Sequence, residues 1–123
     1  MNLEVLLKDL RTVKGYKGSG ITNYTGEVLA GDVADQNTNI PLIAAMTNDI
    51  FLRAHDVAER HAGAECDETN IIGRKTTVLM RCTGPNSKAH LHIGCVIAAD
   101  GNTALARMIM AKIATKAVEM MSK

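Results

Sequence analysis

The stretch KGSGITNYTGEVLAGD, residues 17–32, decides the fold that we expect for this chain. Residues 21–24 and 27–30 are two short runs typical of strands, and Thr25-Gly26 between them is a turn signal. Strands joined by so short a turn pair antiparallel, so residues 18–32 are predicted to form a β-hairpin. The small residues Gly18, Ser19 and Gly20 would let another backbone or helix approach the first strand closely.

Helices are expected on both sides of this hairpin and after a further group of strands. Leucines at spacings of three and four predict a helix over residues 2–14 that ends at Gly15. A longer helix is predicted over 39–61, capped by Thr38 or Asn39. Strands are then expected over 64–72, 74–83 and 89–99, followed by a helix over 103–121 that Asn102 or Thr103 could cap. The order α-β-β-α-β-β-β-α indicates an α+β fold, an antiparallel sheet with helices on its faces, in a single domain spanning residues 1–123.

The long helix carries more apolar residues than one buried face requires. One stripe is made of Ile43, Met46, Ile50, Ala54, Val57, Ala58 and His61. Leu42, Ala45 and Leu52 lie outside it. Apolar residues on a second side of a helix indicate a second covered surface, and we expect another subunit to cover it.

Composition excludes several classes of function. The 14 Lys and Arg residues nearly balance the 13 Asp and Glu residues, and no basic block stands out, so we expect no nucleic-acid partner. Aromatic residues are only 2% of the chain, too few to offer stacking platforms for single strands. No window approaches the roughly 18 apolar residues of a membrane span, so no membrane insertion is expected. Three cysteines without tight spacing do not indicate a disulfide framework, which favours a reduced, cytoplasmic location.

The stretch HLHIGC, residues 90–95, raises the question of a metal site. Side chains alternate between the faces of a strand, so His90 and His92 share one face and Cys95 lies on the other. Matching the apolar faces of the neighbouring strands places Cys82 with the leucines, away from the histidines. Zinc needs three or four converging ligands, and only two share a direction here.

A third ligand could come from His55 or His61 on the long helix. The two histidines of HLHIGC are nevertheless expected to face Arg81 and Lys75, which is a poor environment for a cation. We therefore predict no metal site and no cofactor.

No set of catalytic residues emerges elsewhere. Cys82 and Cys95 lie in apolar patterns typical of a core, and the acids around Cys66 disfavour the thiolate that a nucleophile needs. GYKGSG, residues 15–20, lacks the lysine and hydroxyl of a phosphate loop and does not follow a strand. No fixed spacing sets a paired-carboxylate geometry among the loop and edge acids, which are Asp32, Asp35, Glu65, Asp67 and Glu68. We predict that the protein is not an enzyme.

Three segments in this order, LLKDL (6–10), GITNYTGEVLAG (20–31) and ADGNTALARMIMAKI (99–113), resemble the roadblock family, named for a dynein light chain. The resemblance extends from about residue 3 to 120. It implies a five-stranded antiparallel sheet with the long second helix on one face and the N- and C-terminal helices on the other. It also implies a homodimer in which the sheets join along strand 64–72 and the second helices lie side by side.

Members of the roadblock family act as partners or regulators of Ras-like small GTPases, or as dynein and scaffold subunits. The resemblance thus implies a dimeric interaction module that binds a Ras-like small GTPase, with the outer surface of the second helix as its platform. The residues expected there are Asp49, Arg53, Asp56 and Arg60. The same acid–base pairs, four residues apart, would also stabilise an exposed helix without any partner. The family does not require an arginine finger.

The alternative is a small-molecule sensor of profilin-, PAS- or GAF-like architecture, with a ligand between the sheet and the long helix. Such pockets usually have aromatic linings, and the scarcity of aromatic residues disfavours this function.

Overall fold

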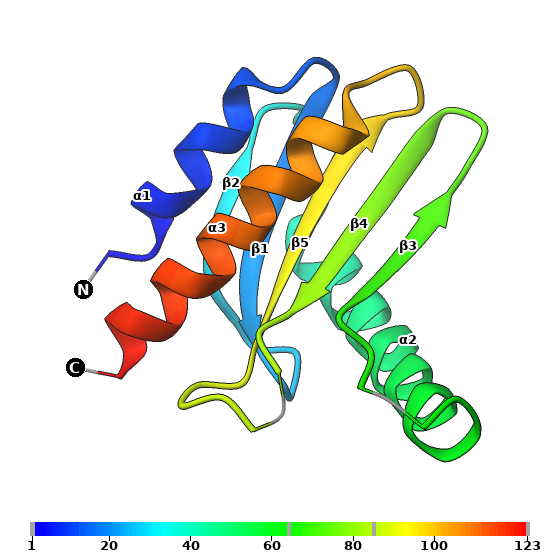
Figure 1. The fold of residues 1–123 in the computed structure, drawn as a ribbon. Helices are drawn as coiled ribbons and strands as arrows, with labels where there is room; N and C mark the ends of the chain where they lie inside the picture. Colours follow the sequence, from blue (N-terminus) through cyan, green and yellow to red (C-terminus); the bar gives the residue numbers. More distant parts are fainter. Residues whose placement is uncertain (1, 64, 85, 123) are drawn as a thin grey trace.

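The chain folds into three layers around one antiparallel sheet (Figure 1). This computed structural model describes residues 2–63, 65–84 and 86–122. The elements in chain order are α1 (Glu4–Leu7), the 3₁₀ helix η1 (Lys8–Thr12), β1 (Tyr16–Asn23), β2 (Val28–Val33), α2 (Ile40–His61), β3 (Glu68–Ile72), β4 (Thr76–Cys82), β5 (Leu91–Ala98) and α3 (Thr103–Met121). The predicted fold class and element order are confirmed.

The sheet has the strand order β2-β1-β5-β4-β3, and every neighbouring pair is antiparallel. The predicted hairpin is β1 and β2, and Gly26 in its turn has a φ of +91°. Asn23 Oδ1 closes this turn by accepting from the backbone N–H groups of Thr25 and Glu27, both at 3.0 Å. β2 and β3 are the edge strands, and β5 lies at the centre.

The ends of several strands and of the first helix differ from the predicted ones, and β1 begins already at Tyr16. The strand predicted over 64–72 begins only at Glu68, and the first helix is a single α-turn that continues as 3₁₀ helix. Of the two cap candidates for each long helix, the asparagine is the cap: Asn39 Oδ1 accepts from Leu42 N, and Asn102 Oδ1 accepts from Leu105 N, each at 3.1 Å. These caps satisfy backbone donors that have no partner inside the helix.

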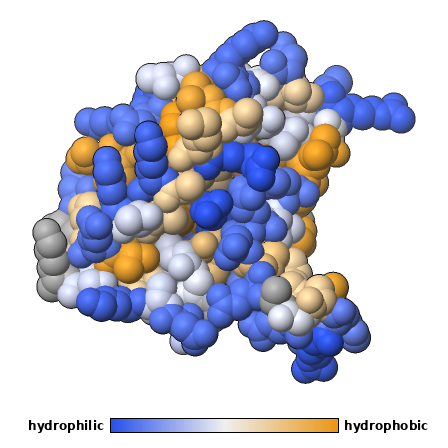
Figure 2. All heavy atoms as spheres, viewed as in Figure 1, coloured by the Kyte–Doolittle hydropathy of each residue, from blue (hydrophilic) through white to orange (hydrophobic). Residues whose placement is uncertain are grey.

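The larger core lies between the sheet and the layer of α1, η1 and α3. Alternation along β5 directs one set of its side chains into this core, and α3 contributes its buried residues from the other side. The buried residues of this core include Leu7, Leu10, Ile21, Leu79, Leu91, Ile93, Cys95, Ile97, Ala106, Met110, Ile113 and Ala117. On the outer side of this layer, hydrophilic residues interleave with small apolar groups (Figure 2).

The opposite face of the sheet is covered by α2 alone (Figure 1). Its buried cluster is small and consists of Phe51, Met80 and Cys82. The first turn of α2 lies directly on β1, where a Cβ on Gly18 would be 2.9 Å from Ile40 Cδ1. The predicted use of the Gly18–Gly20 stretch for close approach is therefore confirmed.

The face of α2 that packs on the sheet is not the predicted apolar stripe. The buried residues of α2 are Ile40, Asn48, Phe51 and His55. Met46, Ile50 and Val57 of the predicted stripe are exposed, as is Leu42. Two of the four buried residues are thus polar, while large apolar residues of the predicted stripe face solvent, so apolar periodicity alone selected the wrong face. No helix in the described ranges is long and apolar enough to cross a membrane.

Candidate functional site

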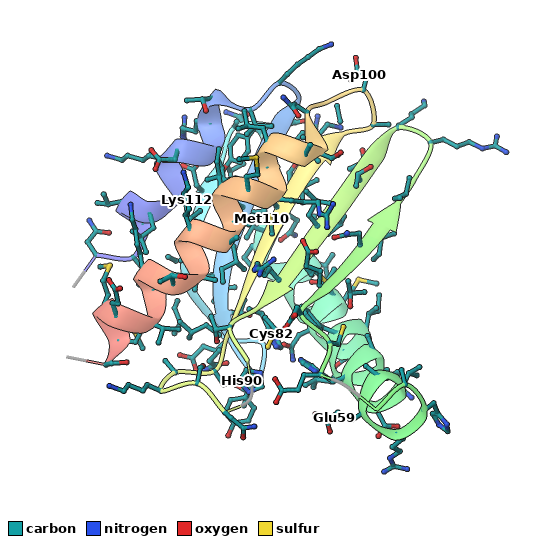
Figure 3. All side chains as sticks on the ribbon, in the orientation of Figure 1. Glu59, Cys82, His90, Asp100, Met110 and Lys112 are labelled. Atoms are coloured by element: carbon teal, nitrogen blue, oxygen red, sulfur yellow. The ribbon has the colours of Figure 1, made fainter. Side chains whose placement is uncertain are left out.

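Four metal-ligating side chains meet between α2 and the sheet. Cys82 ends β4 and lies opposite His92 of β5 in the antiparallel register. His90 stands just before β5, and His55 comes from the buried face of α2. One sulfur or ring-nitrogen atom from each of the four lies within 4.8 Å of every other. Cys82 and His90 are seen together near the end of β4 in Figure 3.

This arrangement corrects the predicted position of Cys82. We expected its strand to place Cys82 with the leucines of β5, but Cys82 shares the α2 face with His92. Arg81 lies opposite Ile93, on the other face. Both faces of the sheet are covered by helices, so both faces of β4 carry apolar residues and matching apolar faces could not choose between them.

Asn48 holds one of the histidines in a defined state. The Asn48 amide nitrogen donates to the backbone oxygen of Tyr24 at 3.1 Å, which turns its Oδ1 toward His92 Nδ1 at 2.8 Å. Because Oδ1 can only accept, His92 Nδ1 carries the proton and Nε2 keeps its lone pair. That Nε2 atom is buried, and no hydrogen-bond partner for it is found among the described residues.

The other histidines are similarly unpartnered within the described part of the chain. Both ring nitrogens of His55 and the Nε2 of His90 are buried without a hydrogen bond. His55 and His92 are only 8% and 5% exposed. A buried polar atom without a partner costs about 1–3 kcal/mol, so this concentration in one place needs an explanation.

Stacked rings fix the orientation of these imidazoles. Phe51 stacks on His55 and on His92, with ring centroids 5.0 and 4.7 Å apart. Tyr24 stacks on His90 at 5.5 Å. The sequence contains three Phe, Tyr or Trp residues, and two of them, Tyr24 and Phe51, pack against this cluster.

The surroundings of His90 and His92 favour the neutral form of both imidazoles. Burial, followed by the charges of His90 and His55, lowers the pKa of His92 to about 4. Burial and the charge of His55 lower the pKa of His90. Burial raises the pKa of the Cys82 thiol, against a hydrogen bond from the Gly84 N–H, and the nearby Asp67, Cys66 and Glu65 raise it further. Neutral imidazole is the form that binds a metal.

The remaining cysteines and the fourth histidine lie outside this cluster. Cys95 is fully buried in the larger core, and burial raises its pKa to about 12, as expected of an inert core thiol. Cys66 is half-buried and within 3.2 Å of the backbone oxygen of Glu68. His61, the other histidine considered from the sequence, is exposed. The sequence signal for the cluster was the spacing of Asn48, Phe51 and His55 on one helical face.

The predicted partner surface is exposed along α2. Asp49, Arg53, Asp56 and Arg60 are all exposed, and Asp56 and Arg60 form an ion pair at 2.7 Å. At about 100° per residue, these four lie opposite the side of α2 that packs on the sheet. Met46, Ile50 and Val57 occupy one flank of the same charged stripe, and Leu42 lies near its start.

Two of the acids considered for a carboxylate site, Asp32 and Glu68, pair with arginines. Asp32 accepts from Arg11 at 2.6 Å and from the Tyr16 hydroxyl at 2.6 Å. Glu68 accepts from Arg107. GYKGSG runs into β1 and forms part of the sheet.

Space for a small-molecule ligand under α2 is limited. A cavity of about 40 Å³ lies between α2 and the sheet, with Ile40, Phe51 and His92 among its lining residues. Ligand pockets usually measure about 300–1,000 Å³. The cavity thus disfavours the small-molecule sensor as the function of this face.

Comparison with known proteins identifies the fold through structure alone. No family model matches the sequence, and no curated protein matches it. A Roadblock/LC7 domain from Streptomyces avermitilis superposes with a TM-score of 0.85 at 13% identity, over 100% of both chains. MglB in a tetrameric arrangement gives 0.82 at 13% identity, over 95% of this chain and 85% of that one. Profilin II from Acanthamoeba castellanii gives 0.56 at 12% identity, over 86% and 87%. The fold of this chain is the roadblock fold.

Proposed function

We propose that the chain is a dimeric, non-enzymatic module that binds a Ras-like small GTPase and regulates it or scaffolds a complex around it. The observation that carries the proposal is the roadblock fold with an α2 surface left open to solvent. A cytoplasmic location belongs to the proposal, since Cys66, Cys82 and Cys95 are free thiols.

Support for a dimer comes from apolar side chains without a covering layer. Leu42, Met46, Ile50 and Val57 of α2 are 56%, 62%, 42% and 58% exposed. An apolar flank on a helix of this kind is typical of a protein–protein interface. β3 is an edge strand, and Ile72 on it is 83% exposed, so its backbone and side chains are open to pairing with a second copy. Both features fit the side-by-side helices and joined sheets that the resemblance implies.

The charged stripe supports a second partner on the same helix. Asp49, Arg53, Asp56 and Arg60 point away from the sheet, beside the apolar flank that the dimer would use. An exposed ion pair such as Asp56–Arg60 contributes little to folding, about 0–1 kcal/mol. Its charges are therefore free to serve a partner surface of complementary charge.

The test is affinity capture from the native lysate with the purified protein, once with a non-hydrolysable GTP analogue and once with GDP. We expect a Ras-like GTPase to be enriched in one nucleotide state, and the state distinguishes an effector or activator from an exchange or storage role. The captured GTPase is then titrated against Arg53→Glu/Arg60→Glu.

A matched control is available on the opposite layer of the fold. Lys112 and Lys116 of α3 are exposed, and their double change to Glu alters the net charge equally. We expect the α2 variant to lose at least about tenfold in affinity, about 1.4 kcal/mol, and the α3 variant to retain it. Equal affinities for both variants would reject the α2 surface, and capture of no GTPase would reject the function.

A further inference from the structure

The cluster of three histidines and one cysteine between α2 and the sheet is not used by the proposed interaction function. Its ligand atoms all lie within 4.8 Å of one another, and its buried ring nitrogens have no hydrogen-bond partner among the described residues. We propose that His55, Cys82, His90 and His92 form a tetrahedral binding site for Zn²⁺, which ties α2 to the sheet. The proposed site does not depend on GTPase binding and is tested separately from it.

The donor set favours zinc. Structural Zn²⁺ sites take four ligands from cysteine sulfur and histidine nitrogen, and this cluster offers three nitrogens and one sulfur. Oxygen-seeking ions such as Mg²⁺ and Ca²⁺ would find no carboxylate in the cluster. With four protein ligands, no coordination position is left for a substrate, so the site would be structural.

The separations are close to those of a bound site. Zinc bonds of about 2.0–2.1 Å to nitrogen and 2.3 Å to sulfur place tetrahedral ligand atoms roughly 3.3–3.6 Å apart. No two of the ligand atoms are more than 4.8 Å apart, so a contraction of the order of 1 Å is enough to form the site. Rotation of the imidazoles can supply this contraction, because His90 lies before β5, outside the strand, and His55 belongs to α2 and not to the sheet.

The hydrogen-bond geometry already prepares one ligand. Asn48 Oδ1 fixes the proton on His92 Nδ1, at 2.8 Å, and leaves Nε2 free to coordinate. Histidines that bind metals commonly donate their other N–H in this way, and such partners contribute to affinity. Coordination would satisfy one nitrogen of each histidine, which removes most of the unpartnered atoms of the cluster.

The local charges also suit a cation. The charges of Asp67 and Glu65 disfavour the thiolate form of Cys82 and so raise its pKa. A divalent cation bound to the sulfur would favour the thiolate and lower that pKa. Arg81 lies on the opposite face of β4, where Glu68 pairs with it at 3.6 Å. The predicted repulsion from Arg81 is thus removed by the register of the strands.

The first experiment prepares the full chain metal-free with a chelator and titrates it with Zn²⁺ and with Co²⁺. We expect one ion per chain, a higher Tm with Zn²⁺, and for Co²⁺ the strong visible absorption of tetrahedral coordination with a thiolate-to-cobalt band in the near ultraviolet. Absence of stoichiometric binding by the folded chain would overturn the proposal.

Two pairs of variants assign the ligands. Cys82→Ser and His92→Gln remove proposed ligands, whereas Cys66→Ser and His61→Gln change the nearby residues of the same types. Loss of the hydrogen-bond partner of a metal ligand typically weakens metal binding roughly 10–100-fold. We expect Cys82→Ser and His92→Gln, which remove the ligands themselves, to weaken Zn²⁺ binding by more than that. Cys82→Ser should also abolish the thiolate-to-cobalt band. The second pair should bind like the unchanged chain. Unaltered binding by Cys82→Ser and His92→Gln, or loss with the second pair alone, would overturn the assignment.

Discussion

Glu68 of β3 accepts hydrogen bonds from two nitrogens of Arg107 of α3, at 3.0 and 2.7 Å. The pair joins an edge strand to the helix layer, and Arg81 of β4 approaches the same carboxylate at 3.6 Å. The hydrogen bonds from Arg107 lower the pKa of Glu68, and its partial burial opposes this only in part.

The first prediction concerns the pH dependence of this pair. A carboxylate with a lowered pKa in the folded state stabilises the fold above its unfolded pKa of about 4.5, and this contribution is lost as the pH falls through the folded value. Arg107→Gln should therefore lower Tm near neutral pH and lose its effect below Glu68's folded pKa. The measurement is Tm against pH for both proteins. A constant difference across the acid range would show that Arg107 acts through packing, and high salt should shrink the difference at neutral pH.

The second prediction concerns the cap of α3. Asn102→Ala removes the acceptor for Leu105 N and should lower the free energy of unfolding by about 1 kcal/mol. Asn102→Ser keeps a capping oxygen and should stay within a few tenths of a kcal/mol of the unchanged protein. Urea unfolding of the three proteins measures the difference. Equal losses for Ala and Ser would mean that the asparagine does not act through its cap.

The third prediction concerns the contact of α2 with β1. A methyl group on Gly18 would meet Ile40 Cδ1 at 2.9 Å and the backbone oxygen of Asp32 at 3.1 Å. Gly18→Ala should cost about 1–3 kcal/mol through overpacking. Ile40→Val removes Cδ1, so the double variant should be more stable than the sum of the two single changes predicts. Strict additivity in a double-mutant cycle would contradict a direct clash between the two positions.

The fourth prediction concerns the apolar flank of α2. Met46→Lys places a charge in the proposed dimer contact and should convert a dimer to a monomer by light scattering. Met108 of α3 is equally exposed, at 62%, and lies on the other layer, so Met108→Lys serves as the matched control and should leave the mass unchanged. If both variants dissociate, the cause is a general loss of stability. If neither variant dissociates, the dimer uses a different interface.

Most of the fold could be predicted because local chemistry and global architecture agree there. Gly26 in the hairpin turn and the caps at Asn39 and Asn102 each lie where their physical preferences place them. The start of β3 was predicted too early, since a polar run such as AECDE carries no alternation that marks where pairing begins.

The metal-ligand cluster could not be predicted for a different reason. It depends on which residue of β4 faces His92, and register is weakly marked when both faces of a strand are covered. It also depends on a helix that buries Asn48 and His55 and leaves Met46 and Ile50 exposed, the reverse of the usual pattern. Asn48, Phe51 and His55 at i, i+3 and i+7 on one helical face, together with a His-X-His strand, were the available signal.

The two cores on either side of the sheet are very unequal. α3 rests on a broad apolar layer, whereas among the described residues the buried cluster under α2 consists of Phe51, Met80 and Cys82. Opening of α2 alone therefore exposes little apolar surface and needs less free energy than complete unfolding. In native-state hydrogen exchange, the amides of α2 should exchange as a group well before those of β5 and α3. The helix that we propose as the partner surface is then also the part of the molecule that can rearrange on its own.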